Sequence, residues 1–148
     1  MSLKERLMDD LKQAMRDKDA LRRETIRMVR SAVRYAEIEW QREATDEEII
    51  SLIQREVKRR QEALEMFRKG GRQDLVTTEE AALKILQEYL PRQLDEQEIR
   101  QVVERIVSEL GASGPSQLGP VMRKAMAELR GRADGRLVNQ IAREILSR

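Results

Sequence analysis

The sequence predicts an all-α protein of two domains, and three observations support this. Apolar residues recur at helical spacing along almost all of the 148 residues, whereas no stretch alternates for long enough to indicate a strand. Capping sequences mark several helix starts, and Gly or Pro marks the helix ends. We therefore expect seven helices, at residues 3–17, 20–42, 46–69, 78–90, 96–110, 117–130 and 135–147.

The first three helices form the expected scaffold of the N-terminal domain. Ser2-Leu3-Lys4-Glu5 is a capping box, because the Ser2 hydroxyl can accept from a first-turn amide while Glu5 reaches back. Thr45-Asp46-Glu47-Glu48 repeats this pattern before the third helix. The second and third helices are long and their connection is short, so we expect them to form a long antiparallel hairpin.

The fourth helix is expected to begin at another capping sequence, Thr77-Thr78-Glu79-Glu80, and to end before Pro91. In front of it, Gly70-Gly71 stops the third helix. The residues between, 70–76, are therefore expected to form a polar loop whose one apolar pair, Leu75 and Val76, tucks against the bundle.

A domain boundary is expected near Pro91, which gives an N-terminal four-helix domain, 1–92, and a small C-terminal three-helix domain, 93–148. Asp95 and Glu98 offer a weaker capping box for the fifth helix. Glycines at 111 and 131 end the fifth and sixth helices. Since a domain of this size is near the lower limit for independent folding, we expect it to lean on the first domain or on a partner.

Composition excludes several classes of function. The chain contains no Cys and no His, so Ser-His-Asp and Cys-His triads are impossible and a structural zinc site is excluded. It has no phosphate-cradling or dinucleotide-binding glycine motif. No metal, no cofactor and no catalytic site of its own are therefore expected. No apolar run approaches the ~20 residues that span a bilayer, and no signal-peptide core follows Met1, so we expect no membrane segment and a cytoplasmic location.

The net charge of +2 conceals an uneven distribution. Residues 95–110 carry a net charge of −3, whereas residues 111–148 hold seven basic and three acidic side chains, a net charge of +4. Six of those basic side chains surround a tight turn at 131–135: Arg123, Lys124, Arg130, Arg132, Arg136 and Arg143. Turn amides, the start of the last helix and these side chains could together hold a phosphate. The alternative is a solvated face with local Arg–Glu pairs.

Two further basic segments, 16–34 and 54–72, each hold seven basic and three acidic side chains. The first places four arginines on one helical face: Arg23, Arg27, Arg30 and Arg34. Such a face could follow a nucleic-acid backbone, or its arginines could pair with nearby acids. Tyr35 and Trp40 could stack on bases, but the favoured interpretation is that they cover the far end of the hairpin.

Several segments of the sequence resemble the YqeY family. The resemblance runs in order from residue 2 to about residue 146 and covers practically the whole chain. Each segment is a weak signal alone, and together, with suitable spacing, they are a strong one. They are residues 2–7, 12–16, 26–32, 71–75, 88–94, 111–113 and 131–139.

The resemblance implies a C-terminal domain similar to the tail of GatB, a subunit of the tRNA-dependent amidotransferase, where the tail engages the tRNA body. A related module is appended to some glutaminyl-tRNA synthetases. The implied function is an accessory protein that binds tRNA or another structured RNA. The residues carried over by the resemblance are Gly131, Arg132, Asp134, Gly135, Arg136 and Asn139, and the charge distribution adds Arg123, Lys124 and Arg130.

Two other functions stay open at this point. The chain could be a protein-interaction adaptor that docks on an amidotransferase or an aminoacyl-tRNA synthetase, which the charged helices and the small C-terminal domain favour. The family is also linked to carbon–nitrogen ligase activity with glutamine as amido donor. The absence of a Cys nucleophile and of a candidate ATP site argues against this chain catalysing that reaction alone.

Overall fold

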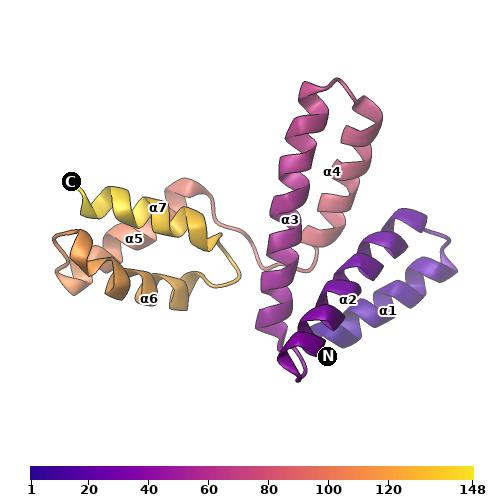
Figure 1. Ribbon diagram of the computed structural model, residues 1–148, viewed down its shortest axis with the longest axis horizontal. Helices are drawn as coiled ribbons and strands as arrows, with labels where there is room; N and C mark the ends of the chain where they lie inside the picture. The colour runs from indigo at the N-terminus through magenta and orange to yellow at the C-terminus, as the bar shows by residue number, and fades with distance from the viewer. The chain divides into compact units, whose positions relative to one another are not determined.

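Every regular element of the structure, a computed structural model that describes residues 1–148, is a helix, which confirms the predicted all-α class. A short 3₁₀ turn, η1 (Pro115–Gln117), precedes the sixth α-helix. The α-helices are α1 (Leu3–Arg16), α2 (Ala20–Trp40), α3 (Asp46–Lys69), α4 (Gln73–Gln87), α5 (Glu96–Leu110), α6 (Leu118–Leu129) and α7 (Gly135–Leu146) (Figure 1).

The chain divides into two units, Met1–Pro91 and Arg92–Arg148, called unit 1 and unit 2 below. The division falls one residue before the boundary expected from composition. Each unit encloses its own set of buried apolar side chains, and the two sets share no member.

The helices of unit 1 pair differently from the expected hairpin. α1 lies along α2, and α3 lies along α4, while α2 and α3 contact each other less (Figure 1). Tight turns explain these pairs, because Lys18 (φ 54°) and Gly71 (φ 70°) adopt left-handed backbone conformations that reverse the chain within three residues. The longer connection at 41–45 does not force α2 and α3 alongside each other.

The fourth helix begins five residues earlier than predicted, at Gln73, and ends at Gln87. Thr77 and Thr78 are therefore inside the helix and are not its cap. Their hydroxyls donate back to the carbonyls of Gln73 (3.1 Å) and Asp74 (3.2 Å), the i−4 bond that Thr can make within a helix. The early start also buries Val76, which is 3% exposed, in the core of unit 1. The expected loop at 70–76 is thus shortened to residues 70–72.

The other capping sequences behave as predicted. Ser2 Oγ accepts a hydrogen bond of 3.1 Å from the amide of Glu5. Thr45 and Glu48 form a complete capping box at the start of α3. Asp95 and Glu98 form a second complete box at the start of α5, where only a weaker one was expected. Both boxes satisfy amides that a helix start would otherwise leave unpaired.

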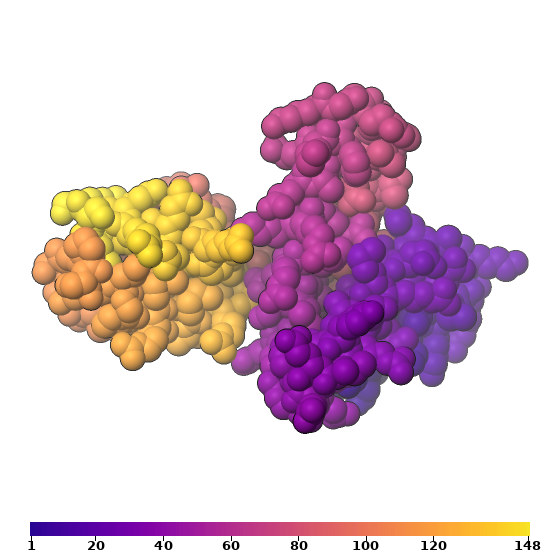
Figure 2. Space-filling model, viewed as in Figure 1, coloured from indigo at the N-terminus to yellow at the C-terminus, as the bar shows by residue number.

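Unit 2 has a closed core of its own despite its small size. Side chains fill the space among its three helices (Figure 2). The buried set, which takes residues from all three helices and the α6–α7 turn, is Ile99, Val103, Ile106, Val121, Ala125, Leu129, Ala133, Val138, Ile141, Ala142, Ile145 and Leu146. This core fixes the turn that the sequence singled out as a binding site.

Candidate nucleic-acid interface

The α6–α7 turn, residues 130–134, is held by the chain segment that opens unit 2. The amide of Leu94 donates to the carbonyl of Arg132 at 2.9 Å, and Gln93 Nε2 donates to the carbonyl of Gly131 at 2.7 Å. Gly131 is buried and has a φ of 82°, a conformation that suits glycine. The backbone of the turn therefore has a structural role, which leaves its side chains for binding.

The start of α7 is already occupied by a carboxylate. Asp134 caps the helix, and its Oδ1 accepts from the amide of Arg136 at 3.1 Å. A phosphate at this helix start would compete with that oxygen and would meet its negative charge. The expectation that turn amides help to hold a phosphate is therefore not supported at this position. Asp134 and Gly135 shape the turn, and binding falls to the arginine side chains.

The arginines around the turn differ in how far their charge is compensated. Arg136 is exposed and forms no ion pair in the structure. Arg132 lies near Glu98, where it adds to the larger effect of Arg92 in lowering the pKa of that carboxyl. Arg92 itself holds Glu98 at 2.9 Å, so Arg132 keeps most of its charge available. These two side chains are the strongest candidates in unit 2.

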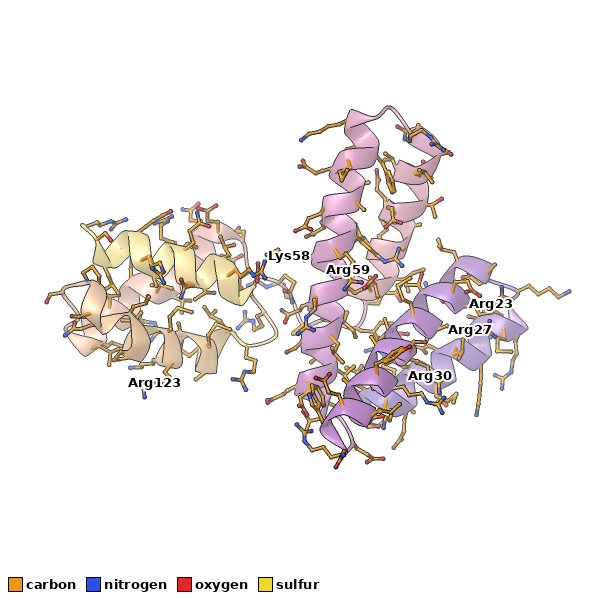
Figure 3. The ribbon with its side chains drawn as sticks, viewed as in Figure 1. Arg23, Arg27, Arg30, Lys58, Arg59 and Arg123 are labelled. Carbon is orange, nitrogen blue, oxygen red and sulfur yellow. The ribbon has the colours of Figure 1, made fainter.

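The remaining basic residues of the predicted site do not gather at one point. Arg123 is exposed and unpaired, and it points out from α6 on the side away from α7 (Figure 3). It lies seven residues before Arg130, which is roughly 10 Å along the helix axis. Lys124, one position on, faces α5 instead, where its Nζ pairs with Glu109 at 2.7 Å.

Asn139 and Arg143 form a local pair on α7. Arg143 Nε donates to Asn139 Oδ1 at 2.7 Å, the i, i+4 spacing that brings helical side chains together. The amide group of Asn139 therefore orients Arg143, which lies two turns beyond Arg136 and is exposed. The sequence placed Asn139 in the site directly, whereas the structure places it beside a guanidinium.

The basic segment of α3 is mainly structural. Arg60 is only 12% exposed and bridges two carboxylates, Glu56 at 3.2 Å and Glu79 at 3.1 Å. Arg68 pairs with Glu80. The alternative of intrachain pairing, which the sequence left open for this segment, thus applies to these two arginines.

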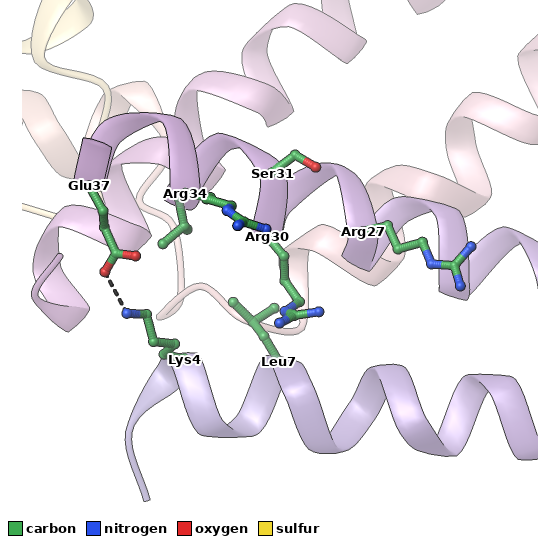
Figure 4. Close-up of a pocket in the computed structure, with 8 residues that line it drawn as sticks. Lys4, Leu7, Arg27, Arg30, Ser31, Arg34 and Glu37 are labelled. Carbon is green, nitrogen blue, oxygen red and sulfur yellow. Dashed lines mark hydrogen bonds and ion pairs between the residues drawn. The ribbon is translucent and has the colours of Figure 1, made fainter. Parts of the chain in front are cut away.

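The arginines of α2 form a different kind of surface. Arg23, Arg27 and Arg30 follow one another along the helix (Figure 3). Beside them lies a groove of about 510 Å³ between α1 and α2, to which α2 contributes Arg27, Arg30 and Arg34. Lys4 enters from α1 and pairs with Glu37 at 2.5 Å (Figure 4). The sequence indicated the arginine stripe, but only the packing of α1 on α2 brings Lys4 into it.

Tyr35 is a residue whose placement the sequence predicted wrongly. It does not cover the end of a hairpin, because 78% of its surface is exposed. Trp40 is more covered, at 38% exposed, and the guanidinium of Arg42 lies 5.0 Å from its ring centroid. An exposed tyrosine beside an arginine stripe is a signal that could have been weighed for binding.

None of the helices combines the length and the apolar composition needed to cross a membrane.

Comparison with known proteins places the chain among described relatives. A family model described as "Yqey-like protein" matches residues 4–146, which is nearly the whole chain. A relative from Pyrenophora tritici-repentis, named altered inheritance of mitochondria protein 41, mitochondrial, is 34% identical over 145 residues. That match covers 95% of this chain and 79% of the relative.

A second group of relatives carries another name. One of them, a glutamyl-tRNA(Gln) amidotransferase subunit of Thermococcus sibiricus, is 40% identical over 70 residues, which are 45% of this chain and 11% of that protein. The subunit of the same name from Aeropyrum pernix is 36% identical over 104 residues, 68% of this chain and 16% of that protein. The chain thus resembles a small part of these amidotransferase subunits.

Proposed function

The chain belongs to the family of Yqey-like proteins, and on that premise we propose that it binds structured RNA, with tRNA as the expected class, through unit 2. It acts as an accessory to tRNA-dependent amidation and has no catalytic site of its own. The similarity to amidotransferase subunits named for glutamyl-tRNA(Gln) supports this class of RNA.

The observation that carries the proposal is the state of Arg132 and Arg136. Both flank a turn whose backbone is fixed by Gln93 and Leu94, so their attachment points are rigid. Arg136 forms no ion pair, and Arg132 shares Glu98 with the closer Arg92. Guanidinium groups held in this way suit phosphate oxygens, which they can bind through two parallel hydrogen bonds.

The proposal is tested by titrating the full chain into labelled tRNA and measuring fluorescence anisotropy. Arg136→Ala and Lys124→Ala form a matched pair, because each removes one positive charge from the same unit. We expect Arg136→Ala to weaken binding about threefold to tenfold, and Lys124→Ala to change it less, since Glu109 already compensates Lys124. Equal losses, or no retention of tRNA at low salt, would count against the proposal.

An adaptor function is the second candidate, and the exposed apolar side chains of α2 favour it. Tyr35 and Ile38 are 78% and 68% exposed, which is unusual for a protein that meets only water. If the chain docks directly on an amidotransferase or an aminoacyl-tRNA synthetase, complexes with the purified partner will survive ribonuclease treatment. RNA-mediated association will not.

Carbon–nitrogen ligase activity of the isolated chain is the least supported alternative. Its test is glutamine- and ATP-dependent amidation by the purified protein, with a complete amidotransferase as the positive control. We expect no turnover. We keep the cytoplasm as the proposed location, although the Pyrenophora relative is named mitochondrial; cell fractionation decides between the two compartments.

A further inference from the structure

The groove between α1 and α2 in unit 1 is lined mainly by cations. Four basic side chains and one carboxylate border it, which gives the lining a net charge of +3. Leu7 and Val33 form its apolar floor and are almost fully buried. In Figure 4, Lys4 and Leu7 rise from α1, and Arg27, Arg30, Arg34 and Glu37 extend from α2.

The carboxylate of Glu37 does not neutralise the arginines. Its Oε2 accepts from Lys4 Nζ at 2.5 Å and from the amide of Ala44 at 2.8 Å. These bonds, the one from Lys4 foremost, lower the pKa of Glu37. Glu37 therefore compensates Lys4 and is held at the end of the groove.

The arginines of the groove are only partly compensated from elsewhere. Arg27 lies 3.3 Å from Glu24, which Arg23 also contacts at 3.1 Å. Arg30 and Arg34 have no ion-pair partner in the structure. One carboxylate thus serves two of the four arginines of the stripe, and the other two stay without one.

The spacing of these arginines suits a row of phosphates. From Arg27 to Arg34 the helix advances seven residues, roughly 10 Å. Charges along one nucleic-acid strand follow each other at about 3.4 Å of helix axis, so several consecutive phosphates can lie along this distance. A small metabolite with one phosphate would engage only part of the row.

Tyr35 adds a surface for a base beside the phosphate row. It follows Arg34 directly, and its ring is exposed, with no ring contact or hydrogen bond to the rest of the chain. Stacking of a base on an exposed aromatic ring does not depend on the base sequence. It does require a base that is free of a duplex.

We propose that the α1–α2 groove binds an unpaired nucleic-acid strand, with consecutive phosphates along Arg27, Arg30 and Arg34 and a base stacked on Tyr35. The proposal goes beyond the function assigned to unit 2, because it places a second contact surface in unit 1 and names unpaired strands as its ligand.

The test uses the full chain and a short labelled oligouridylate, which has no stable secondary structure. Arg30→Ala/Arg34→Ala is compared with Lys12→Ala/Lys84→Ala, a control that removes the same charge from exposed positions of unit 1 outside the groove. We expect the groove variant to bind about tenfold more weakly, and the control to lose less than about twofold. Circular dichroism melting confirms that both variants fold.

Tyr35 gives a readout that charge alone does not move. Tyr35→Ala is expected to weaken binding several-fold, since stacking on an aromatic ring contributes measurably for each base. Tyr35→Phe, which keeps the ring, should restore it. Ultraviolet crosslinking followed by mass mapping should place the oligonucleotide on the peptide that contains Tyr35.

Several results would overturn the proposal. They are equal losses in the groove variant and its lysine control, crosslinks confined to unit 2, or displacement of the oligonucleotide by an equal charge of polyglutamate, which would indicate an acidic protein partner. Binding of oligouridylate without binding of tRNA would leave this proposal standing and remove the proposed function. Binding of tRNA that only Arg132 and Arg136 affect would do the reverse.

Discussion

The hydroxyl of Tyr89, at the end of unit 1, donates a hydrogen bond of 2.5 Å to Oδ2 of Asp10 on α1. Tyr89 is 4% exposed, and the guanidinium of Arg6 lies 4.5 Å from its ring centroid. Arg6 also donates to the carbonyl of Glu88 at 3.0 Å. The segment that follows α4 is thereby attached to the first helix, directly before the division between the units at Pro91.

Tyr89→Phe isolates the contribution of this hydrogen bond, because the ring and its contact with Arg6 are kept. We expect a loss of about 1 kcal/mol in the free energy of unfolding, the usual net value of one hydrogen bond. Urea titration should show a lower midpoint with an unchanged slope. Tyr35→Phe is the matched control and should leave the midpoint where it was, since Tyr35 is exposed and unbonded.

The same hydrogen bond gives a prediction at alkaline pH. Burial, and then the bond to Asp10, raise the pKa of Tyr89 above its ordinary value of 10.0. Because the folded-state pKa is raised, the stabilisation is complete below about pH 10 and falls as the pH rises further. The melting temperature should drop above pH 10 in the wild type, and this drop should be smaller in Tyr89→Phe.

At acidic pH the capping box of α3 becomes the sensitive element. Arg42 holds Glu48 at 2.7 Å and, together with the amide of Thr45, lowers the pKa of Glu48 from 4.5 to about 2. A lowered pKa in the folded state means that the stabilisation is present above about pH 4.5 and is lost as the pH falls toward 2. Arg42→Ala should therefore lower the melting temperature at pH 6 and have little effect at pH 2. An equal effect at both pH values would contradict this account.

Glycines at two positions of unit 2 should respond oppositely to alanine. Gly131→Ala forces a side chain onto a φ of 82°, and a loss of about 1 kcal/mol or more in unfolding free energy is expected. Gly119 lies in the first turn of α6, and a Cβ there would meet no atom within 4 Å. Gly119→Ala should thus be neutral or slightly stabilising in thermal unfolding.

The closed core of unit 2 predicts that residues 92–148 fold without unit 1. The isolated fragment should show a cooperative helical melt, because its buried set is complete within these residues. A fragment that starts at residue 96 lacks Gln93 and Leu94 and therefore loses two bonds to the α6–α7 turn. It should melt at a lower temperature, and identical melting of the two fragments would contradict the role given to this segment.

Local signals explain why most of the helices could be predicted. Ser2, Thr45 and Asp95 each cap the helix that follows them, and such caps depend on only four neighbouring residues. The predicted start of α4 was wrong for the same reason. Thr77 and Thr78 resemble a cap in sequence, but the burial of Val76 favours an earlier start and turns their hydroxyls to i−4 carbonyls.

The candidate site was predictable only in part, because partners far apart in the sequence decide which charges are free. The sequence treats Lys124 and Arg123 alike, yet Glu109 on α5 reaches only Lys124. It also assigns Asp134 to the site without indicating that its carboxylate occupies the start of α7. The groove beside Arg30 depends on how α1 packs on α2, which no local pattern reveals.

The central claim, that Arg132 and Arg136 bind RNA phosphates, is tested most directly by the salt dependence of tRNA binding. The dissociation constant is measured over a range of salt concentrations for the wild type and for Arg132→Ala/Arg136→Ala. If both side chains meet phosphates, the slope of log affinity against log salt becomes shallower by about two in the double variant. An unchanged slope, with affinity equal to that of the wild type, would contradict the claim.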